Sequence, residues 1–407
     1  SHFAPYEALA NLKESPELSM QMTLDADIGE ETYTLSADLE RKSVSGRRVT
    51  RAELGGLPLY YADNLVVLEN GTAYQLTSGF PDYSALLEKL LPLYKNTSFT
   101  TQRDGDETVY DVRAEGETAR ALLSILLPDS AGNLPDGQMV SAEVRMEDGA
   151  VELITISASG TLKDTKQTPF TLSVTLDDLE PSTDFSVPDA VLESLDKTYA
   201  DGELPVITEG LVRLLTGWSN LLHQDALAAD LDISVDCGPV VVKNALRYYR
   251  ETIDGLAVNC INKSGLNIYF SDAGTAVNAN GGEAGDDAKT LTGTTKLLDI
   301  VYLVCQNGDF ELTQEGGTYT YKLTLDDQSM DALLQALAPD AAKLDITFED
   351  CYAQVEIKDE TVSKLAVSCG GAVKVLLTQA GASVTADITF TDDEMPEPSD
   401  DVLSALR

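Results

Sequence analysis

Histidine is the side chain best suited to acid–base catalysis and to zinc binding near neutral pH, and this sequence contains only two. His223 follows a Leu-Leu pair at the end of an apolar segment, and neither a nucleophile nor an orienting acid can be assigned to it. His2 belongs to a Ser-His start that is typical of a cloning remnant. We therefore expect His223 to be structural or solvent-facing, and we predict no catalytic residue.

Carboxylate pairs are the second kind of residue that could do chemistry, either in sugar hydrolysis or as calcium ligands. Asp-Asp pairs occur at 177–178, 286–287, 326–327 and 392–393, at predicted strand ends or loops where acidic residues are ordinarily solvated. Asp25, Asp27 and Gly29 resemble the start of a calcium loop, but a glycine stands where a third oxygen ligand is required. The sequence predicts no glycosidase site, no metal site and no cofactor.

The five cysteines all lie in the second half of the chain, at 237, 260, 305, 351 and 369. Their spacing matches no zinc pattern, and an odd number cannot all pair. Cys351 and Cys369 fall on two predicted strands joined by a turn near Asp359. The expected register leaves them diagonal across the ladder, about 7 Å or more apart, which is too far for an easy bridge. We expect free, buried thiols.

The charge of the chain is abnormal, with 68 acidic against 28 basic residues and a formal net charge of −40. Such a polyanion repels phosphate backbones, so nucleic acid is excluded as a partner. We interpret the acidity as solubility at a crowded cell surface; storage of cations or capture of a basic ligand is the alternative. No stretch approaches eighteen apolar residues. We expect an extracytoplasmic monomer, anchored to a membrane by an upstream lipid or signal segment that this sequence does not contain.

Self-comparison indicates an internal duplication. Two segments place Tyr110 and Tyr321 at the same point, followed by Ala-Leu-Leu and a terminal proline (Pro128 in the first). The same shift of 211 positions holds without a gap from 84–163 to 295–374, and by that shift 18–25 aligns with 229–236. We predict two tandem repeats, residues 1–196 and 197–407, joined by a short polar linker.

Each repeat should contain long antiparallel strands interrupted by leucine-rich helices. Apolar residues alternate with polar ones in 18–24 and 33–39, as in half-buried strands. Leucines recur at helical spacing in 82–94 and 211–222, and the matching helix of the second repeat is 296–305. These patterns predict an α+β fold in which a curved antiparallel sheet carries helices across its concave face.

This order of elements resembles the lipoprotein-carrier fold, the unclosed β-barrel of the LolA, LolB, RseB and LppX group, in two tandem copies. The resemblance covers each repeat almost end to end and rests on the order and lengths of the elements. It implies a hydrophobic groove between sheet and helices, which in that family holds acyl chains or senses lipoproteins. No signature residue is present to carry a functional role across.

The candidate groove residues come from the leucine-rich helices and from two tyrosine doublets, in which one ring faces inward and the other outward. They are Leu86, Leu90 and Leu93, then Leu297 and Val301, and finally Tyr61 and Tyr249. Leucine at helical spacing more often fills an ordinary core than a ligand wall.

We therefore expect a non-catalytic extracytoplasmic lipoprotein that binds an apolar or lipid ligand, such as an acyl chain, or an envelope protein through its curved sheets. A structural or adhesive cell-surface spacer without a ligand is the alternative, and a hydrolase is a third reading. A carrier requires an apolar cavity of several hundred cubic ångströms, whereas a spacer packs its core solid.

Overall fold

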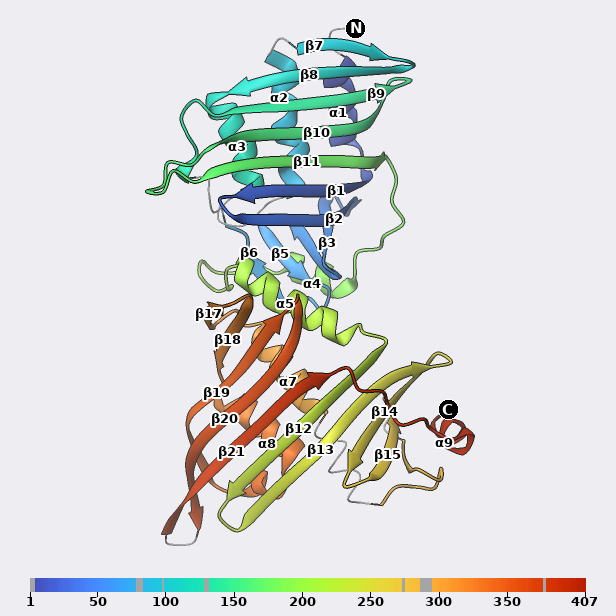
Figure 1. The fold of residues 1–407 in the computed structure, drawn as a ribbon, viewed down its shortest axis with the longest axis vertical. Helices are drawn as coiled ribbons and strands as arrows, with labels where there is room; N and C mark the ends of the chain where they lie inside the picture. Colours follow the sequence, from blue (N-terminus) through green and yellow to red (C-terminus); the bar gives the residue numbers. More distant parts are fainter. Residues whose placement is uncertain are drawn as a thin grey trace. The chain divides into compact units, whose positions relative to one another are not determined.

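The computed structural model describes residues 4–77, 83–96, 99–127, 132–272, 275–285, 295–375 and 378–407. The chain divides into two compact units, Ser1–Glu209 (unit 1) and Gly210–Arg407 (unit 2). Each unit consists of one antiparallel sheet with helices packed on it, so the fold is α+β (Figure 1). Pro128, Asp82 and the pair 286–287, on which expectations were placed, lie outside the described residues.

The sheet of unit 1 has eleven strands in the order β6-β5-β4-β3-β2-β1-β11-β10-β9-β8-β7. The strands are β1 Glu17–Ile28, β2 Glu31–Val44, β3 Arg47–Leu54, β4 Leu57–Ala62, β5 Leu65–Leu68, β6 Ala73–Gln75, β7 Phe99–Asp104, β8 Glu107–Glu115, β9 Met139–Glu147, β10 Ala150–Thr161 and β11 Pro169–Glu180. No pairing joins β6 to β7 among the described residues, so the barrel is unclosed. The alternation predicted for β1 is confirmed, because Leu18, Met20, Met22 and Leu24 are buried between more exposed residues.

Two tight turns fix the register of the strands at one end of this sheet. Ser45 and Gly46, with φ of 52° and 80°, join β2 to β3, as in the two-residue hairpin turn that needs positive φ at both positions. Gly55 and Gly56, with φ of 56° and 80°, join β3 to β4 in the same way. A continuous row across the sheet follows, in which Arg41 faces Thr50 and Thr50 faces Tyr61.

Three helices lie across one face of the unit 1 sheet, the helix face: α1 Ala4–Glu14, α2 Leu86–Asn96 and α3 Gly116–Leu126 (Figure 1). A single 3-10 turn, η1 Tyr83–Ala85, precedes α2, so the α-helix begins later than the predicted 82. The fourth helix, α4 Asp189–Asp196, packs on the outer face. Its Val191 and Leu195 join a core cluster with Val49, Tyr60 and Val67.

The sheet of unit 2 has ten strands in the order β16-β15-β14-β13-β12-β21-β20-β19-β18-β17. They are β12 Ala226–Cys237, β13 Val240–Ile253, β14 Leu256–Lys263, β15 Leu266–Ser271, β16 Ala276–Asn278, β17 Glu311–Glu315, β18 Thr318–Thr324, β19 Ile346–Lys358, β20 Thr361–Val375 and β21 Thr378–Thr391. Its helices are α5 Glu209–Leu222, α7 Lys296–Cys305, α8 Asp327–Leu337 and α9 Asp400–Leu406, with a 3-10 turn η3 Ala341–Lys343.

The apolar stripe predicted for α5 is buried in unit 2. Trp218 is fully buried and its ring lies 5.9 Å from that of Tyr302 on α7. Gly217 permits a close approach to the sheet, because a Cβ at this position would lie 2.6 Å from Cδ1 of Ile357. The helix α9 packs instead on the outer face, where Val402 and Leu406 contact a cluster that includes Tyr249.

The two units present the same succession of elements over the region of the 211-position shift: α2, β7, β8, α3, β9 and β10 in unit 1, and α7, β17, β18, α8, β19 and β20 in unit 2. At the start of each unit the hairpins correspond by 209 positions, since Gly29 and Gly238 follow the first strands. The alignment of 18–25 with 229–236 is therefore wrong by two residues, which keeps every side chain on its face. The duplication itself stays a prediction.

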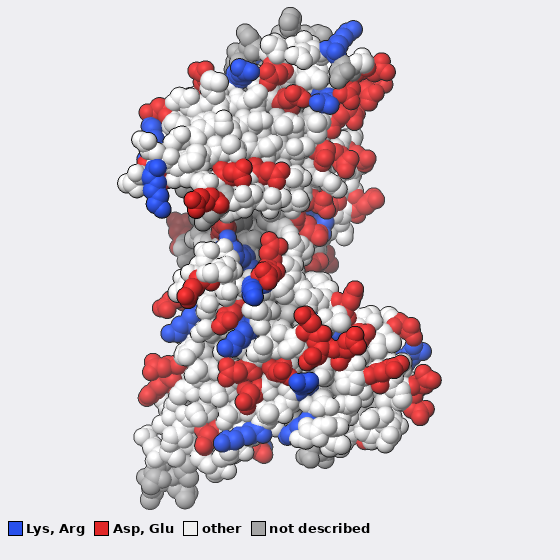
Figure 2. Space-filling view, viewed as in Figure 1, with Lys and Arg blue, Asp and Glu red and all other residues white. Residues whose placement is uncertain are grey.

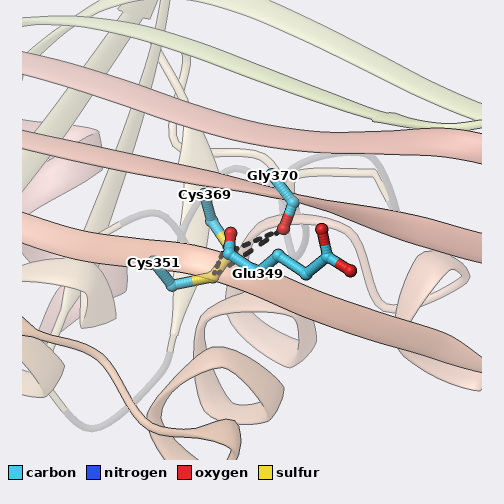
Figure 3. The surroundings of a disulfide bond; sticks show 4 residues. All are labelled: Glu349, Cys351, Cys369 and Gly370. Atoms are coloured by element: carbon cyan, nitrogen blue, oxygen red, sulfur yellow. Dashed lines mark hydrogen bonds between the residues drawn. A yellow bond between two sulfur atoms is a disulfide. The ribbon is translucent and has the colours of Figure 1, made fainter.

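Cys351 and Cys369 form a disulfide with their Cα atoms 4.0 Å apart (Figure 3), so the expectation of free thiols at these positions is wrong. The cause is a bulge nearer the turn. Ile357 pairs with Val362 but Glu356 pairs with Lys364, so Ser363 is an extra residue on β20. This shift by one position brings Cys351 opposite Cys369, whereas the unshifted register would place it opposite Ser368.

The other three cysteines are free and buried. Burial raises the pKa of both Cys260 and Cys305 to about 12. The pKa of Cys237 is also raised, mainly by burial and in addition by the negative charge of Asp236. Thiols with raised pKa values and no access to solvent react slowly. We expect no rapid reaction with Ellman's reagent in the native protein at pH 8, three thiols after unfolding without reductant, and five after reduction. Five thiols before reduction would exclude the disulfide.

The linker after α4 packs back onto unit 1, so the compact unit extends beyond the predicted boundary at 196–197. Tyr199 and Leu204 pack against the core cluster beneath α4. Val206 forms a parallel bridge with Gln75 of β6, and the amide of Ile207 donates to the carbonyl of Gln75 at 3.1 Å. Residues 197–207 are thus part of unit 1 in packing, while the repeat boundary stays a prediction.

Acidic side chains are spread over both units on the face drawn in Figure 2, and Lys and Arg side chains are few and scattered. None of the helices in the described ranges is long and apolar enough to cross a bilayer.

Candidate functional site

The groove candidates of unit 1 lie on the helix face but are packed in the core. Leu86, Leu90 and Leu93 on α2 and Tyr61 on β4 are all buried. Tyr61 lies in the wall of a cavity together with Leu87, a leucine of α2 that was not among the candidates. Sequence periodicity placed the helix correctly but did not identify which leucine lies beside the open space.

The candidates of unit 2 separate onto two faces of its sheet. Leu297 and Val301 are buried on α7. Tyr249 packs with Val258, Cys260 and Tyr269 beneath α9 on the outer face. Its neighbour Tyr248 occupies the other face, as the alternation of a strand requires. The structure therefore does not bring Tyr249 together with Leu297 and Val301 in one groove.

A cavity of about 200 Å³ opens in unit 1 between the start of α2, the end of α1 and strands β2–β4. We call it the basic pocket. It is lined by three cations, Lys13, Arg41 and Arg48, and by two acids, Asp63 and Glu88. The rest of the wall consists of Thr50, Tyr61, Ala62, Ala85 and Leu87. A water molecule requires about 10–15 Å³ of such space, so the pocket has room for a polyatomic group.

Arg41 is the most buried of the three cations, with 6% of its surface exposed. Its Nη2 donates to the carbonyls of Leu12, at 2.5 Å, and Ser15, at 3.1 Å, at the carboxyl end of α1. A cation at this end of a helix is stabilised by the free carbonyls. Burial, and then the neighbouring Arg48, lower the pKa of Arg41 to about 10, so the guanidinium is still charged at neutral pH.

A second, much smaller cavity of about 10 Å³ adjoins the basic pocket. The two share Arg41, Thr50 and Leu87, and the smaller one is otherwise lined mainly by apolar side chains of β1 and β2, including Leu18, Met20 and Leu39. The larger cavity is thus mainly polar, whereas the smaller one has apolar side chains of β1 and β2 beside Glu40, Arg41 and Thr50. This polarity suits a molecule with a charged head and an apolar remainder.

The sequence contains a signal for the basic pocket in its distribution of charge. Residues 41–51 contain five basic residues and no acidic one, in a chain with 28 basic residues in total. Two predicted strands and a tight turn bring the members of this cluster onto neighbouring positions, with Arg48 opposite Ser43 and Arg41 opposite Thr50. A local excess of positive charge on so acidic a chain was the available indication of a site.

Other reactive groups give no arrangement for catalysis in the part of the chain that the structure describes. His223 donates from its Nδ1 to the carbonyl of Ser219 on its own helix at 2.8 Å. Burial raises the pKa values of Tyr83 and Tyr94 well above their usual range, as expected of core hydroxyls. No group of three or more His, Cys, Asp or Glu among those residues is arranged to hold a metal ion.

No family model matches the chain, and no curated protein matches it. Among solved structures, the chain is similar to LprF from Mycobacterium bovis, with 11% identity, a TM-score of 0.30, and coverage of 46% of this chain and 96% of that chain. It is similar to lipoprotein LppX from Mycobacterium tuberculosis, with 10% identity, a TM-score of 0.28, and coverage of 46% of this chain and 97% of that chain. It is also similar to an outer membrane lipoprotein-sorting protein domain from Vibrio parahaemolyticus. The identity is 12%, the TM-score is 0.25, and the similarity covers 48% of this chain and 98% of that chain.

Each of these similarities covers less than half of this chain and nearly all of the other. At such identities and TM-scores the similarities carry no argument about what this chain binds. The ligand of this chain has to be inferred from its own residues.

Proposed function

We propose that the chain is a non-catalytic extracytoplasmic binding protein that takes an amphiphilic lipid ligand in unit 1. The observation that carries the proposal is the junction at Leu87, where the basic pocket meets the apolar cavity under α2. The apolar part of the ligand would enter between α2 and strands β1 and β2, beside Leu18, Met20 and Leu39. Leu86, Leu90 and Leu93 lie on the same helix and would form the deeper wall of the opened groove.

The apolar cavity is too small for an acyl chain, so binding has to separate α2 from the sheet. Each methylene transferred from water contributes about 0.8 kcal/mol, and a long chain offsets the cost of such a movement. Net affinity in the micromolar range or tighter is expected.

A second function is favoured by a specific observation. Leu86, Leu90, Leu93, Leu297 and Val301 are packed in the cores of their units with almost no exposed surface. A structural or adhesive spacer needs no more than such solid cores. The two functions differ in whether α2 can move away from the sheet to admit a ligand.

Titration of delipidated protein with a fluorescent fatty acid tests the proposal. We expect saturable binding, and we expect Leu87→Phe to weaken it about tenfold or more, since an added ring fills the junction between the two cavities. The matched control is Leu298→Phe, which changes the corresponding leucine of α7 in unit 2 and should leave the affinity within about twofold.

Both variants have to retain the wild-type circular dichroism spectrum for the comparison to count. Absence of saturable binding to the wild-type protein would favour the spacer. Equal weakening by both variants would move the ligand site away from Leu87.

A further inference from the structure

A buried cation with an unsatisfied donor lies in the wall of the basic pocket. Arg41 uses Nη2 for two carbonyls of α1, but its Nε is buried and has no hydrogen-bond partner among the described residues. A buried donor without a partner costs about 1–3 kcal/mol, and more when the group is charged. An ion or a water molecule that completes the set of hydrogen bonds is one explanation of such a donor.

We propose that the basic pocket binds an oxyanion, a phosphate or a carboxylate, through Arg41, Arg48 and Lys13. A guanidinium binds two oxygens of such a group at once, and charge-assisted hydrogen bonds are about twice as strong as neutral ones. The hydroxyl of Thr50 lies in the same wall, one strand from Arg41.

The cations of the pocket are partly balanced by acids. Asp63 accepts a hydrogen bond from Nε of Arg47 at 2.6 Å, but Arg47 also donates to Asp196 at 2.9 Å, so one cation serves two acids. Glu14 lies 3.6 Å from Lys13 and 3.9 Å from Arg48, and the three side chains are partly or largely exposed. Such exposed pairs contribute little and exchange readily. Glu88 is the other acid of the wall, so the wall itself contains three cations and two acids.

Unit 2 contains an arginine at the corresponding position. Arg250 faces Asn259, which faces Phe270, in a row that corresponds to Arg41, Thr50 and Tyr61. Nη2 of Arg250 donates to the carbonyls of Leu222, at 2.6 Å, and Leu221, at 3.5 Å, at the carboxyl end of α5. The framework of a buried arginine that caps a helix is therefore common to both units.

The acids around Arg250 are the counterparts of those around Arg41, since Asp272 and Asp299 correspond to Asp63 and Glu88, but a cation is missing. Ala257 stands at the position of Arg48, opposite Thr252. Asp299 and Asp272 both act on this region electrostatically. Asn259 is held within the unit, because it accepts from the hydroxyl of Tyr248 at 2.7 Å and donates to Asp272 at 3.0 Å. Unit 2 thus keeps the acids of the site but lacks the counterpart of Arg48, and its Asn259 is already bonded, so oxyanion binding is expected in unit 1.

The oxyanion could come from free phosphate or from the head group of an amphiphile. The inference does not depend on the acyl chain, because the pocket would bind the anion with or without an apolar remainder. A phosphate-binding pocket without lipid binding, and lipid binding without use of the pocket, are separate outcomes.

Calorimetric titration of the full chain distinguishes them, with sodium phosphate, sodium dodecanoate below its micellar concentration and dodecanol as three separate probes in a phosphate-free buffer of low ionic strength. The variants are Arg48→Gln, which removes an accessible cation of the pocket, and Arg247→Gln, which removes an exposed arginine of unit 2 as the matched control. We expect Arg48→Gln to weaken phosphate and dodecanoate about tenfold or more, and Arg247→Gln to change both less than twofold. A double variant, Lys13→Gln with Arg48→Gln, should weaken them further.

Phosphate binding that Arg48→Gln weakens supports the inference even if dodecanol and dodecanoate add nothing, in which case the proposed lipid function fails. The inference is overturned if phosphate does not bind and if dodecanoate and dodecanol bind with equal affinities that Arg48→Gln does not change. The proposed lipid function would then still stand. Equal weakening by Arg48→Gln and Arg247→Gln would assign the effect to net charge and overturn it as well.

Discussion

Replacement of Leu297 by alanine is expected to lower the free energy of unfolding of unit 2 by about 2–5 kcal/mol, the cost of truncating a buried leucine whose surroundings cannot collapse. Leu297 is 0% exposed on α7. The same helix supplies the control, because Leu303 is 59% exposed. Leu303→Ala should change the free energy by less than about 0.5 kcal/mol.

Trp218 makes the measurement specific to unit 2, since it is the single tryptophan of the chain and is buried on α5. Its fluorescence during urea unfolding reports the stability of that unit alone. If Leu297 bordered an open groove instead of a filled core, its truncation would cost about as little as that of Leu303.

Removal of the disulfide by Cys351→Ala with Cys369→Ala is expected to destabilise unit 2 by about 3 kcal/mol, because the bond closes a loop with a sequence separation of 18. For a unit of this size the melting temperature should fall by about 6–12 °C, again followed by Trp218 fluorescence.

A reducing agent supplies the control for this variant. It should lower the melting temperature of the wild-type protein to that of the double variant and leave the variant unchanged. Peptide mapping without reduction that recovers only unlinked peptides around Cys351 and Cys369 would contradict the pairing.

The sequence was sufficient to predict the elements of the fold but not the irregularities between them. Helical spacing identified α7 at 296–305 at the observed bounds, and alternation identified 18–24 within β1. Each signal lies within a single element. The bulge at Ser363 is a property of two strands together, and one extra residue on β20 was enough to bring a predicted diagonal pair opposite each other in a disulfide.

The candidate site was predicted less completely than the fold, for a physical reason. Leucines that fill a core and leucines that border a cavity have the same spacing, so Leu87 could not be distinguished from Leu86 or Leu90. Arg41 could not be identified as a site residue because its role depends on contacts between distant parts of the chain. These are its burial, its hydrogen bonds to the end of α1, and the register that places Thr50 beside it.

The packing of the linker along β6 has a consequence for the sheet of unit 1. A terminal strand with free amides and carbonyls is a template on which a strand of another molecule can add. The bridge from Val206 to Gln75 and the flanking hydrogen bonds of Pro205 and Ile207 occupy that template from within the same chain. The segment that connects the units therefore also guards unit 1 against edge-to-edge polymerisation, and a fragment ended at 196 would lose this protection.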